Sequence, residues 1–399
     1  MENKGTNRWF VVFGAVLLQL CLGAIYSWSL FNQPLVDKFG WEKDSVLLTF
    51  SIAIFVFAAA TLISGRLQDQ IGPRKVAMIG GVLYGGGMIL ASFATSLPMM
   101  YISYGVIAGA GVGFAYVCPL STCVKWFPEK KGFITGIAVG AFGLGSMVFK
   151  SVIEFFLNTT GVSQTFMYVG LIYMVLVLIG AQFLKVPETT GTAKTAAKAE
   201  SKNFTVGEML KEKSFLPVWF MYLVGCLPGL LVIGLAKDIG VEMAKLDPAV
   251  AANAVGLIAL FNAGGRLGWG TVSDKLGRIQ VVLILFVLTI GSLLYLRFMP
   301  LNMVTFFISL AAIACSFGGF LSVFPTIVSD FYGVKNLGAN YGVVFQAYGI
   351  AAIAGPFLKK GAGSLGMTFI IAAGFAVIGA VLAMIVKGQR AAVAKTAKA

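Results

Sequence analysis

The chain of 399 residues contains no histidine. This absence removes histidine metal sites, histidine proton relays and the Ser-His-Asp triad. Charged residues are also scarce, at 12% of the chain, whereas soluble domains carry about a quarter. The five cysteines lie inside apolar runs, and their odd number and spacing fit neither a zinc site nor a set of disulfides. The composition therefore excludes a water-soluble domain, and we expect neither an enzyme nor a bound cofactor or metal.

Long apolar runs recur along nearly the whole chain. Hydrophobic residues make up 58% of the sequence, and the mean hydropathy is +0.89. A helix that crosses a bilayer needs about 20 apolar residues, and charge clusters and turn residues divide the chain into segments of that length. The twelve predicted spans lie near 9–31, 45–64, 76–94, 98–124, 132–155, 165–184, 215–236, 250–271, 280–298, 302–325, 337–358 and 367–386. We therefore expect an all-α membrane protein with twelve transmembrane helices.

The distribution of Lys and Arg predicts the orientation. Of these 30 residues, 21 fall on the side of the N-terminus and 7 on the opposite side. Because cytoplasmic loops carry the excess of Lys and Arg, we expect both termini in the cytoplasm. The net charge of +14 is then a consequence of topology, and no nucleic-acid partner is expected. We expect a multi-pass monomer surrounded by lipid in the bacterial cytoplasmic (inner) membrane.

A polar segment separates the first six predicted spans from the last six. It is rich in Lys, Ala, Thr and Glu, with a helical stretch expected near Val206–Lys213. The predicted organisation is an N-terminal six-helix half at 1–185, a cytoplasmic linker at 186–214, a C-terminal six-helix half at 215–386 and a disordered basic cytoplasmic tail at 387–399.

An internal repeat supports this division. The pattern G-x3-D-x2-G followed by a cation occurs at residues 65–74 and again at 270–278, with an offset of 205. Phe142-Gly143 and Tyr348-Gly349 match at an offset of 206. Glycine permits tight turns between helices, and a carboxylate is favoured at a helix N-terminus. We therefore expect two short loops whose aspartates face helix N-termini and nearby arginines.

Two six-helix repeats with this loop motif resemble the major facilitator superfamily over almost the whole chain. The resemblance implies two halves that rock about a substrate site near the bilayer midplane. It also implies that the loop motifs latch the cytoplasmic side in one state. The residues assigned to this gate are Gly65, Asp69, Gly72, Arg74, Asp274, Gly277 and Arg278.

Arg266 lies deep in a predicted span, where an arginine costs roughly 2.5–3.5 kcal/mol. Asn262 precedes it by one turn and shares its face, and no predicted span holds a deeply placed Asp or Glu. Two interpretations stay open: the side chain reaches the headgroup region, or its planar fork binds the carboxylate of a cargo. The second is favoured. Lys150 and Glu154 are expected to form an ion pair near the outer end of their span, and their role is left open.

Several short stretches narrow the resemblance to the oxalate:formate antiporter family, which is related to the proton-coupled monocarboxylate transporters. The pattern from Val232 to Asp238 and from Ala251 to Val255 is more similar still to its pyruvate-linked branch. The stretches that carry the family resemblance are Asn7-Arg8-Trp9, Tyr26-Ser27-Trp28-Ser29-Leu30, Trp126-Phe127-Pro128-Glu129-Lys130-Lys131-Gly132 and Asn340-Tyr341-Gly342.

The resemblance implies a set of cavity residues. The carboxylate-binding arginine of the oxalate transporter falls on Arg266, two cavity tyrosines fall on Tyr26 and Tyr116, and a helix-eleven tryptophan falls on Phe345. Together with Asn262, Leu30, Leu321 and Tyr348, these residues are expected to bind the substrate, which is a small organic anion.

The departures from the family pattern indicate which anion. Tyr348 stands where the oxalate transporter has a second cation, a lysine, and Leu321 stands where it has a cavity tyrosine. One cation leaves a dianion half-neutralised in a low-dielectric site, at a cost of several kcal/mol. We therefore expect a monocarboxylate such as pyruvate, lactate or formate, and we expect oxalate to be disfavoured.

The mode of coupling stays open. Compared with the proton-coupled monocarboxylate transporters, Asn262 replaces an aspartate and Leu30 replaces a lysine, and neither substitute titrates. Proton-linked symport, anion exchange and facilitated diffusion are all compatible with these residues. An oxalate/formate exchanger and a non-transporting carboxylate sensor remain as alternative functions.

Overall fold

The computed structural model describes the chain apart from residues 1–6, 188–202 and 397–399. The first half consists of α1 (Arg8–Gly23), a 3₁₀ segment (Ala24–Trp28), α2 (Ser29–Phe39), α3 (Lys43–Ile71), α4 (Pro73–Ser92), α5 (Leu97–Met100), a π-helical segment (Tyr101–Ala108), α6 (Gly109–Trp126), α7 (Lys131–Thr160) and α8 (Val162–Gln182). The second half follows α9 (Val206–Lys211). It consists of α10 (Phe215–Asp238), α11 (Pro248–Leu276), α12 (Arg278–Phe298), α13 (Met303–Tyr332), α14 (Leu337–Ala362) and α15 (Leu365–Thr396).

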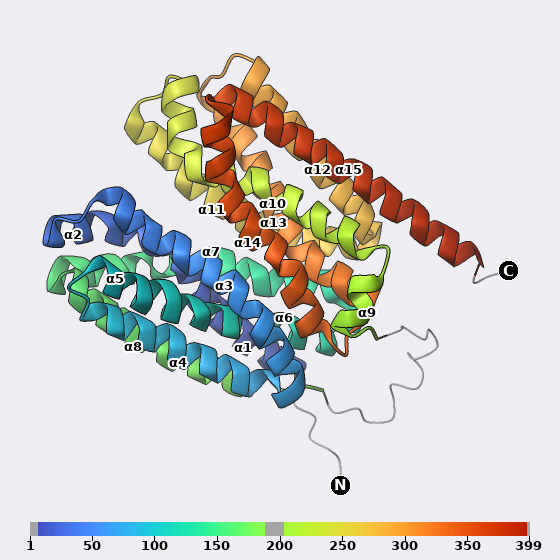
Figure 1. Ribbon diagram of the computed structural model, residues 1–399, viewed down its shortest axis with the longest axis horizontal. Coiled ribbons are helices and arrows are strands. Elements are labelled where there is room, and N and C mark those ends of the chain that lie inside the picture. The colour runs from blue at the N-terminus through green and yellow to red at the C-terminus, as the bar shows by residue number, and fades with distance from the viewer. Residues whose placement is uncertain (1–6, 188–202, 397–399) are drawn as a thin grey trace, which may run out of the picture.

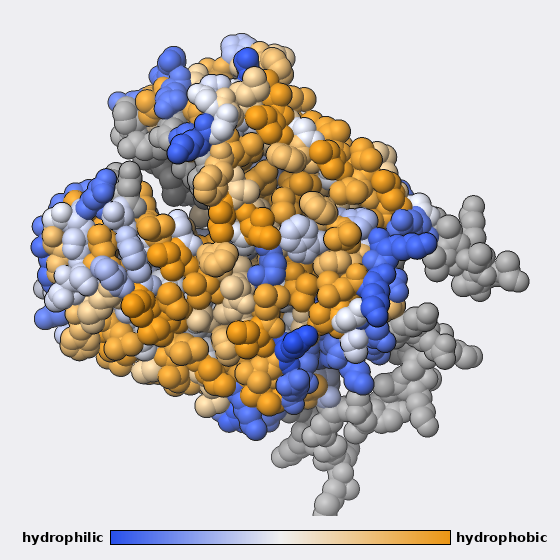
Figure 2. Space-filling model, in the orientation of Figure 1, coloured by the Kyte–Doolittle hydropathy of each residue, from blue (hydrophilic) through white to orange (hydrophobic). Residues whose placement is uncertain are grey.

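The described part of the chain is helical and holds no strand. Eleven of its helical segments are long and apolar enough to cross a membrane. The remaining predicted span falls on α11, a helix of 29 residues. Figure 2 shows that apolar side chains dominate the flanks of the molecule and that hydrophilic ones gather toward its ends. Aliphatic side chains such as Val287 and Ile308 are exposed on the surface, which suits contact with lipid.

The helices form two groups, which Figure 1 shows as a blue-to-green and a yellow-to-red body. In the first half α4 packs against α8 and α3 against α6, and in the second half α11 packs against α13 and α12 against α15. The main contacts between the halves are α7 with α11 and α3 with α14. These two pairs are related by the internal repeat, so the halves meet through equivalent surfaces.

The two repeated motifs are mostly helical rather than loops, which corrects the expectation. Helix α3 runs to Ile71 and α11 runs to Leu276, so Gly65 and Asp69 lie on the last turns of a helix. Only the second glycine of each motif makes the turn, with φ of +91° at Gly72 and +89° at Gly277. A positive φ of this size is open to glycine and strained for other residues.

The linker and the tail also differ in part from the expectation. The predicted helix near 206–213 is present as α9, and Thr205 and Glu208 form a capping box at its start. The Thr205 N–H group lowers the pKa of Glu208 because it donates to the ionised carboxylate. Residues 188–202 of the linker lie outside the described residues. The tail was expected to be disordered after Lys387, but α15 continues without a break to Thr396.

Candidate functional site

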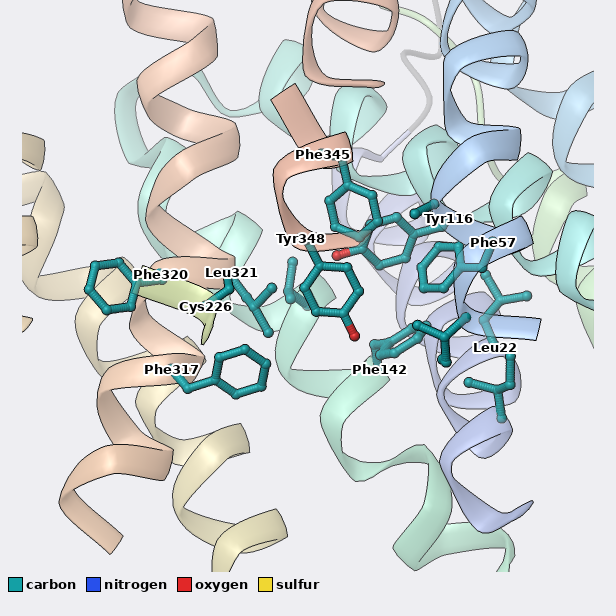
Figure 3. Packing of buried hydrophobic residues seen from close by; sticks show 14 of the residues in the cluster. Leu22, Phe57, Tyr116, Phe142, Cys226, Phe317, Phe320, Leu321, Phe345 and Tyr348 are labelled. Atoms are coloured by element: carbon teal, nitrogen blue, oxygen red, sulfur yellow. The ribbon is translucent and has the colours of Figure 1, made fainter. Parts of the chain in front are cut away.

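A small cavity lies at the boundary between the halves. Its volume is about 10 Å³, about the space that one water molecule requires. Figure 3 shows side chains from both halves converging at this place. The lining residues are Tyr26, Phe57, Tyr116 and Phe142 from the first half and Arg266, Leu321, Phe345 and Tyr348 from the second.

Arg266 is the one cation in this lining, and its side chain is turned into the protein. The residue is 2% exposed, so its side chain does not extend to the surface. Its Nε donates to Asn262 Oδ1 at 2.7 Å, and its Nη1 donates to the main-chain oxygen of Val139 at 2.7 Å. The guanidinium carbon also lies 5.8 Å from the centre of the Phe142 ring. The interpretation that Arg266 reaches the headgroup region does not fit this geometry.

Among the described residues, the guanidinium has no acidic partner. None of the ion pairs within the described residues includes Arg266. Asn262, 5% exposed and placed one turn earlier on α11, orients Arg266 but does not itself line the cavity. A buried cation whose hydrogen-bond acceptors are all neutral is stabilised when an anion binds to it.

Tyrosine hydroxyls supply the other polar groups of the lining. The hydroxyls of Tyr26 and Tyr348 form a hydrogen bond between the two halves, and the Tyr26 hydroxyl also interacts with the guanidinium. Phe345 stacks on Tyr348 with ring centres 4.9 Å apart. Tyr341 lies one turn before Phe345 on the same stripe of α14, but its hydroxyl bonds to that of Tyr222 at 3.2 Å and it does not line the cavity.

Leu30 was also expected to contact the substrate, but it does not line the cavity of the described conformation. It packs, half-buried, against the hydrophobic core and is absent from the lining. The 3₁₀ segment Ala24–Trp28 explains the difference. Residues four apart share a face of an α-helix, with 3.6 residues per turn, but the tighter 3₁₀ turn rotates the later residue away. Tyr26 therefore reaches the cavity and Leu30 does not.

Sequence reasoning missed two aromatic side chains and one main-chain group. Phe57 and Phe142 line the cavity, and the Val139 oxygen binds Arg266. The repeat held a signal for the aromatic pair, because offsets of 205 and 206 place Phe57 opposite Asn262 and Phe142 opposite Tyr348. No side-chain pattern marks a main-chain acceptor such as the Val139 oxygen.

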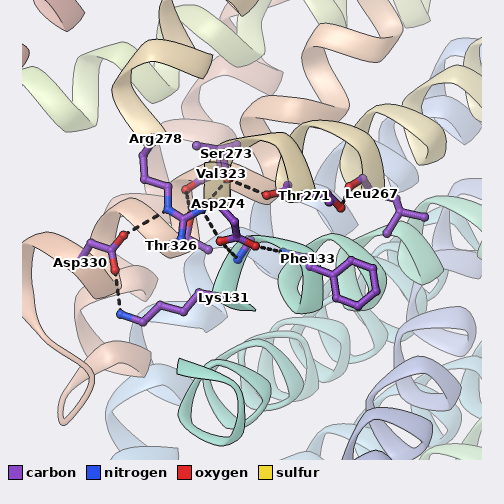
Figure 4. A network of polar contacts seen from close by, with 12 residues as sticks. Lys131, Phe133, Leu267, Thr271, Ser273, Asp274, Arg278, Val323, Thr326 and Asp330 are labelled. Carbon is purple, nitrogen blue, oxygen red and sulfur yellow. Dashed lines mark hydrogen bonds and ion pairs between the residues drawn. The ribbon is translucent and has the colours of Figure 1, made fainter. Parts of the chain in front are cut away.

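The second aspartate of the repeated motif joins the two halves at the end of the molecule where α11 finishes. Asp274 accepts hydrogen bonds from the main-chain N–H groups of Gly132 and Phe133, both at 2.9 Å, at the start of α7. It also pairs with Arg278 at 2.6 Å. Figure 4 shows this contact together with Asp330, which pairs with both Arg278 and Lys131. We call Asp274 and its two main-chain donors the Asp274 latch.

The first aspartate makes the equivalent contact. Asp69 accepts from the Ala339 N–H group at 2.9 Å, at the start of α14. We call this contact the Asp69 latch. Its nearby cation is Lys125, 3.4 Å away, and not an arginine as expected. Arg74 instead donates to Gln182 within the first half.

Glycines bring the halves together at the latches. A methyl group at Gly132 would lie 2.1 Å from the Gly270 oxygen, and one at Gly65 would lie 2.2 Å from the Gly338 oxygen. Along α7 the clearance from α11 grows to 2.7 Å at Gly136 and 3.7 Å at Gly140. The two helices therefore diverge from the latch end toward the cavity. Figure 1 shows the same arrangement, with the halves apart at the end that carries α2.

Comparison with known proteins identifies the family of this chain. The family model described as Major Facilitator Superfamily matches residues 9–356 and 225–399. The chain belongs to the major facilitator superfamily. The protein is therefore a multi-pass membrane transporter and not an enzyme, which confirms the predicted all-α membrane fold and the predicted class.

Relatives of this transporter include proteins named for carboxylates. The chain is 39% identical to the uncharacterized MFS-type transporter YhjX of Escherichia coli, covering 88% of this chain and 87% of that one. It is 33% identical to the oxalate:formate antiporter of Oxalobacter formigenes, covering 88% and 83%. It is 24% identical to apicoplast pyruvate carrier 1 of Toxoplasma gondii, covering 85% and 81%. These matches agree with the predicted oxalate:formate antiporter branch.

A solved structure shares the fold. The proton:xylose symporter XylE matches with a TM-score of 0.69 and 16% identity, and the match covers 94% of each chain. At this identity the match supports the fold of the transporter and carries no information about its cargo.

Proposed function

We propose that this protein is an alternating-access transporter of small monocarboxylate anions such as pyruvate, lactate and formate. The observation that carries the proposal is the buried Arg266, which lines the cavity between the halves and has no acidic partner in the part of the chain that the structure describes. A carboxylate would supply the missing negative charge, and the planar guanidinium can bind it through two parallel hydrogen bonds.

The charge of the lining favours a monoanion. Arg266 carries the one positive charge among the eight lining residues, and the hydroxyls of Tyr26, Tyr116 and Tyr348 are neutral. A monocarboxylate would neutralise the site, whereas a dicarboxylate would leave a net charge of −1 in a low-dielectric cavity. Apolar groups from Phe57, Phe142 and Leu321 suit a short alkyl or keto group better than a second carboxylate.

The described conformation is one in which the cargo route is closed at the latch end. A cavity of about 10 Å³ is too small for formate, which has three heavy atoms. Loading therefore requires the halves to move apart. The predicted cytoplasmic location of the termini would make the closed end cytoplasmic, and the Asp69 and Asp274 latches would be the contacts that open to release cargo into the cell.

The relatives support the same class of cargo. One is named for oxalate and formate and another for pyruvate, all of which are small carboxylates. The bacterial cytoplasmic membrane as the location, and a monomer as the working unit, belong to this proposal.

Uptake by purified protein in liposomes tests the proposal. Labelled formate, acetate, pyruvate, lactate and oxalate are offered to the unmodified protein and to Arg266→Lys. We expect uptake of monocarboxylates, weak uptake of oxalate and a loss of at least about tenfold in Arg266→Lys, because lysine keeps the charge but not the fork. Arg297→Lys is the matched control, since Arg297 stacks on Phe298 at the end of α12 and lies outside the cavity.

Two outcomes would contradict the proposal. Undiminished uptake by Arg266→Lys would show that transport does not require the planar guanidinium to bind the cargo carboxylate. Binding of pyruvate without any flux would assign the protein to carboxylate sensing instead of transport.

A further inference from the structure

The two hydrogen bonds of Arg266 come from different halves of the protein. Asn262 precedes Arg266 by one turn on α11 and belongs to the second half, whereas Val139 is on α7 in the first half. We propose that the Val139 oxygen is a latch on Arg266 that the cargo carboxylate must replace before the halves can part. This inference rests on the proposed function and adds to it the way in which cargo controls the movement.

The position of Val139 makes its bond sensitive to that movement. Helices α7 and α11 are closest at Gly132 and diverge toward Gly140, so the Val139 contact lies where their separation begins. Opening the latch end separates α7 from α11 and stretches the 2.7 Å bond between Val139 and Arg266. The Asn262 bond survives this movement, because both of its residues belong to α11.

Breaking the Val139 bond in the empty protein leaves an N–H donor of the charged guanidinium without an acceptor until water reaches it. Such a loss slows the opening of the empty protein by about 10–100-fold. A carboxylate that spans Nη1 and Nη2 supplies a new acceptor, and the bond to an ionised acceptor is roughly twice as strong as one to a neutral oxygen. Cargo therefore removes the penalty that holds the empty protein closed.

The positions of the two protein acceptors on the guanidinium indicate which one the cargo carboxylate replaces. Asn262 accepts from the single N–H of Nε, and Val139 accepts from one of the two N–H groups of Nη1. A carboxylate that spans Nε and Nη2 therefore meets Asn262, and one that spans Nη1 and Nη2 shares Nη1 with Val139. Replacing Asn262 would release the group that orients Arg266 within its own helix. When the carboxylate replaces the Val139 oxygen instead, the bond that joins the two halves is broken. Of the two replacements, this one couples cargo binding to the movement of the halves.

Some other bonds between the halves do not depend on cargo. The Gln346 amide donates to the Ala58 oxygen at 2.7 Å and to the Thr61 hydroxyl at 3.2 Å, next to the cavity on α14 and α3. None of these residues lines the cavity, so their bonds oppose opening equally in the empty and the loaded protein. The Val139 bond differs from them because it ends on the guanidinium that the cargo also binds, and the Tyr26 hydroxyl contacts the same guanidinium from the first half.

A comparison of exchange with net uptake tests the inference. The unmodified protein is placed in liposomes at a clamped membrane voltage, and uptake of labelled pyruvate is measured into vesicles that are empty or preloaded with unlabelled pyruvate. Preloaded vesicles should take up label about 10–100-fold faster, because the protein returns loaded in both directions. Equal rates would overturn the inference and leave the proposed function intact. No uptake in either case would overturn both.

Gly136→Ala tests the assignment to Val139. A methyl group at Gly136 would lie 2.7 Å from the main-chain oxygen of Arg266 and 3.0 Å from the Leu267 Cα, so it wedges α7 away from α11 without removing a polar group. We expect the ratio of exchange to net uptake to fall several-fold. The matched control is Gly291→Ala, whose methyl group meets open space on α12 and should leave the ratio unchanged. A ratio that Gly136→Ala does not alter would overturn the assignment.

Discussion

The hydroxyl oxygens of Tyr26 and Tyr348 lie 2.5 Å apart across the boundary between the two halves. Tyr26 comes from the 3₁₀ segment after α1, and Tyr348 comes from α14. Both line the cavity that holds Arg266. Tyr348 is the residue compared above with the second cation of the oxalate transporter. Its neutral hydroxyl thus lies in the cavity whose single charge is that of Arg266.

Tyr348→Lys should therefore strengthen the binding of oxalate. The new ammonium group would share the cavity with Arg266 and neutralise the second carboxylate, so we expect the Kd for oxalate to fall at least about tenfold relative to that for pyruvate. Competition of oxalate with labelled pyruvate measures the change. Tyr348→Phe is the control, because it removes the hydroxyl without adding a charge. Oxalate competition that stays the same in Tyr348→Lys would refute the charge argument.

Asp274→Asn should favour the state that is open at the latch end. The substitution removes the charge that accepts two N–H groups at the start of α7 and that pairs with Arg278. Hydrogen bonds to charged groups contribute about 1.5–3 kcal/mol, so the closed population should fall more than tenfold. Spin labels at Lys130 and Lys275, one in each half, report the separation by pulsed electron resonance.

The distance distribution should shift to longer values in Asp274→Asn and also in Asp69→Asn, which breaks the equivalent latch. Asp37→Asn is the control, since Asp37 bonds to Gln33 on α2 and makes no contact between the halves. An unchanged distribution in both latch variants would show that the aspartates do not hold the closed state.

Gly270→Ala should prevent the halves from closing fully. A methyl group at Gly270 would lie 2.4 Å from the Gly132 oxygen, and this main-chain contact cannot yield without moving α7. We expect longer distances between the same spin labels and slower transport. Gly268→Ala, two residues earlier, places its methyl group in open space and should behave as the unmodified protein. Equal behaviour of the two variants would exclude close packing at Gly270 as a requirement for closure.

Much of the fold could be predicted from the sequence because apolar length and the repeat are strong signals. The offset of 205 relates Asp69 to Asp274, and the structure places both at the start of a helix in the opposite half. The ends of helices were less predictable. Polar residues near Gly65 and Asp69 suggested a loop, but α3 continues to Ile71, and both residues contact the second half from within the helix.

The candidate site was predictable at the position where a charged residue lies within an apolar membrane-spanning helix. Arg266 and its neighbour Asn262 stood out because a charge and an amide are costly within an apolar membrane helix, so they indicate a functional site. The Val139 oxygen could not be found in this way, since every residue carries one. The direction of Leu30, away from the cavity of the described conformation, could not be predicted because the local helix type that sets it leaves no clear mark in the sequence.

The most direct measurement for the central claim compares binding and stability in Arg266→Gln. Glutamine keeps a polar group near Asn262 but removes the buried charge, so calorimetric titration with pyruvate should show no binding. The thermal midpoint of the empty protein should stay equal or rise, because an unpaired buried charge costs stability. Unchanged pyruvate affinity in Arg266→Gln would contradict the account, because the cargo would then bind without its proposed anchor.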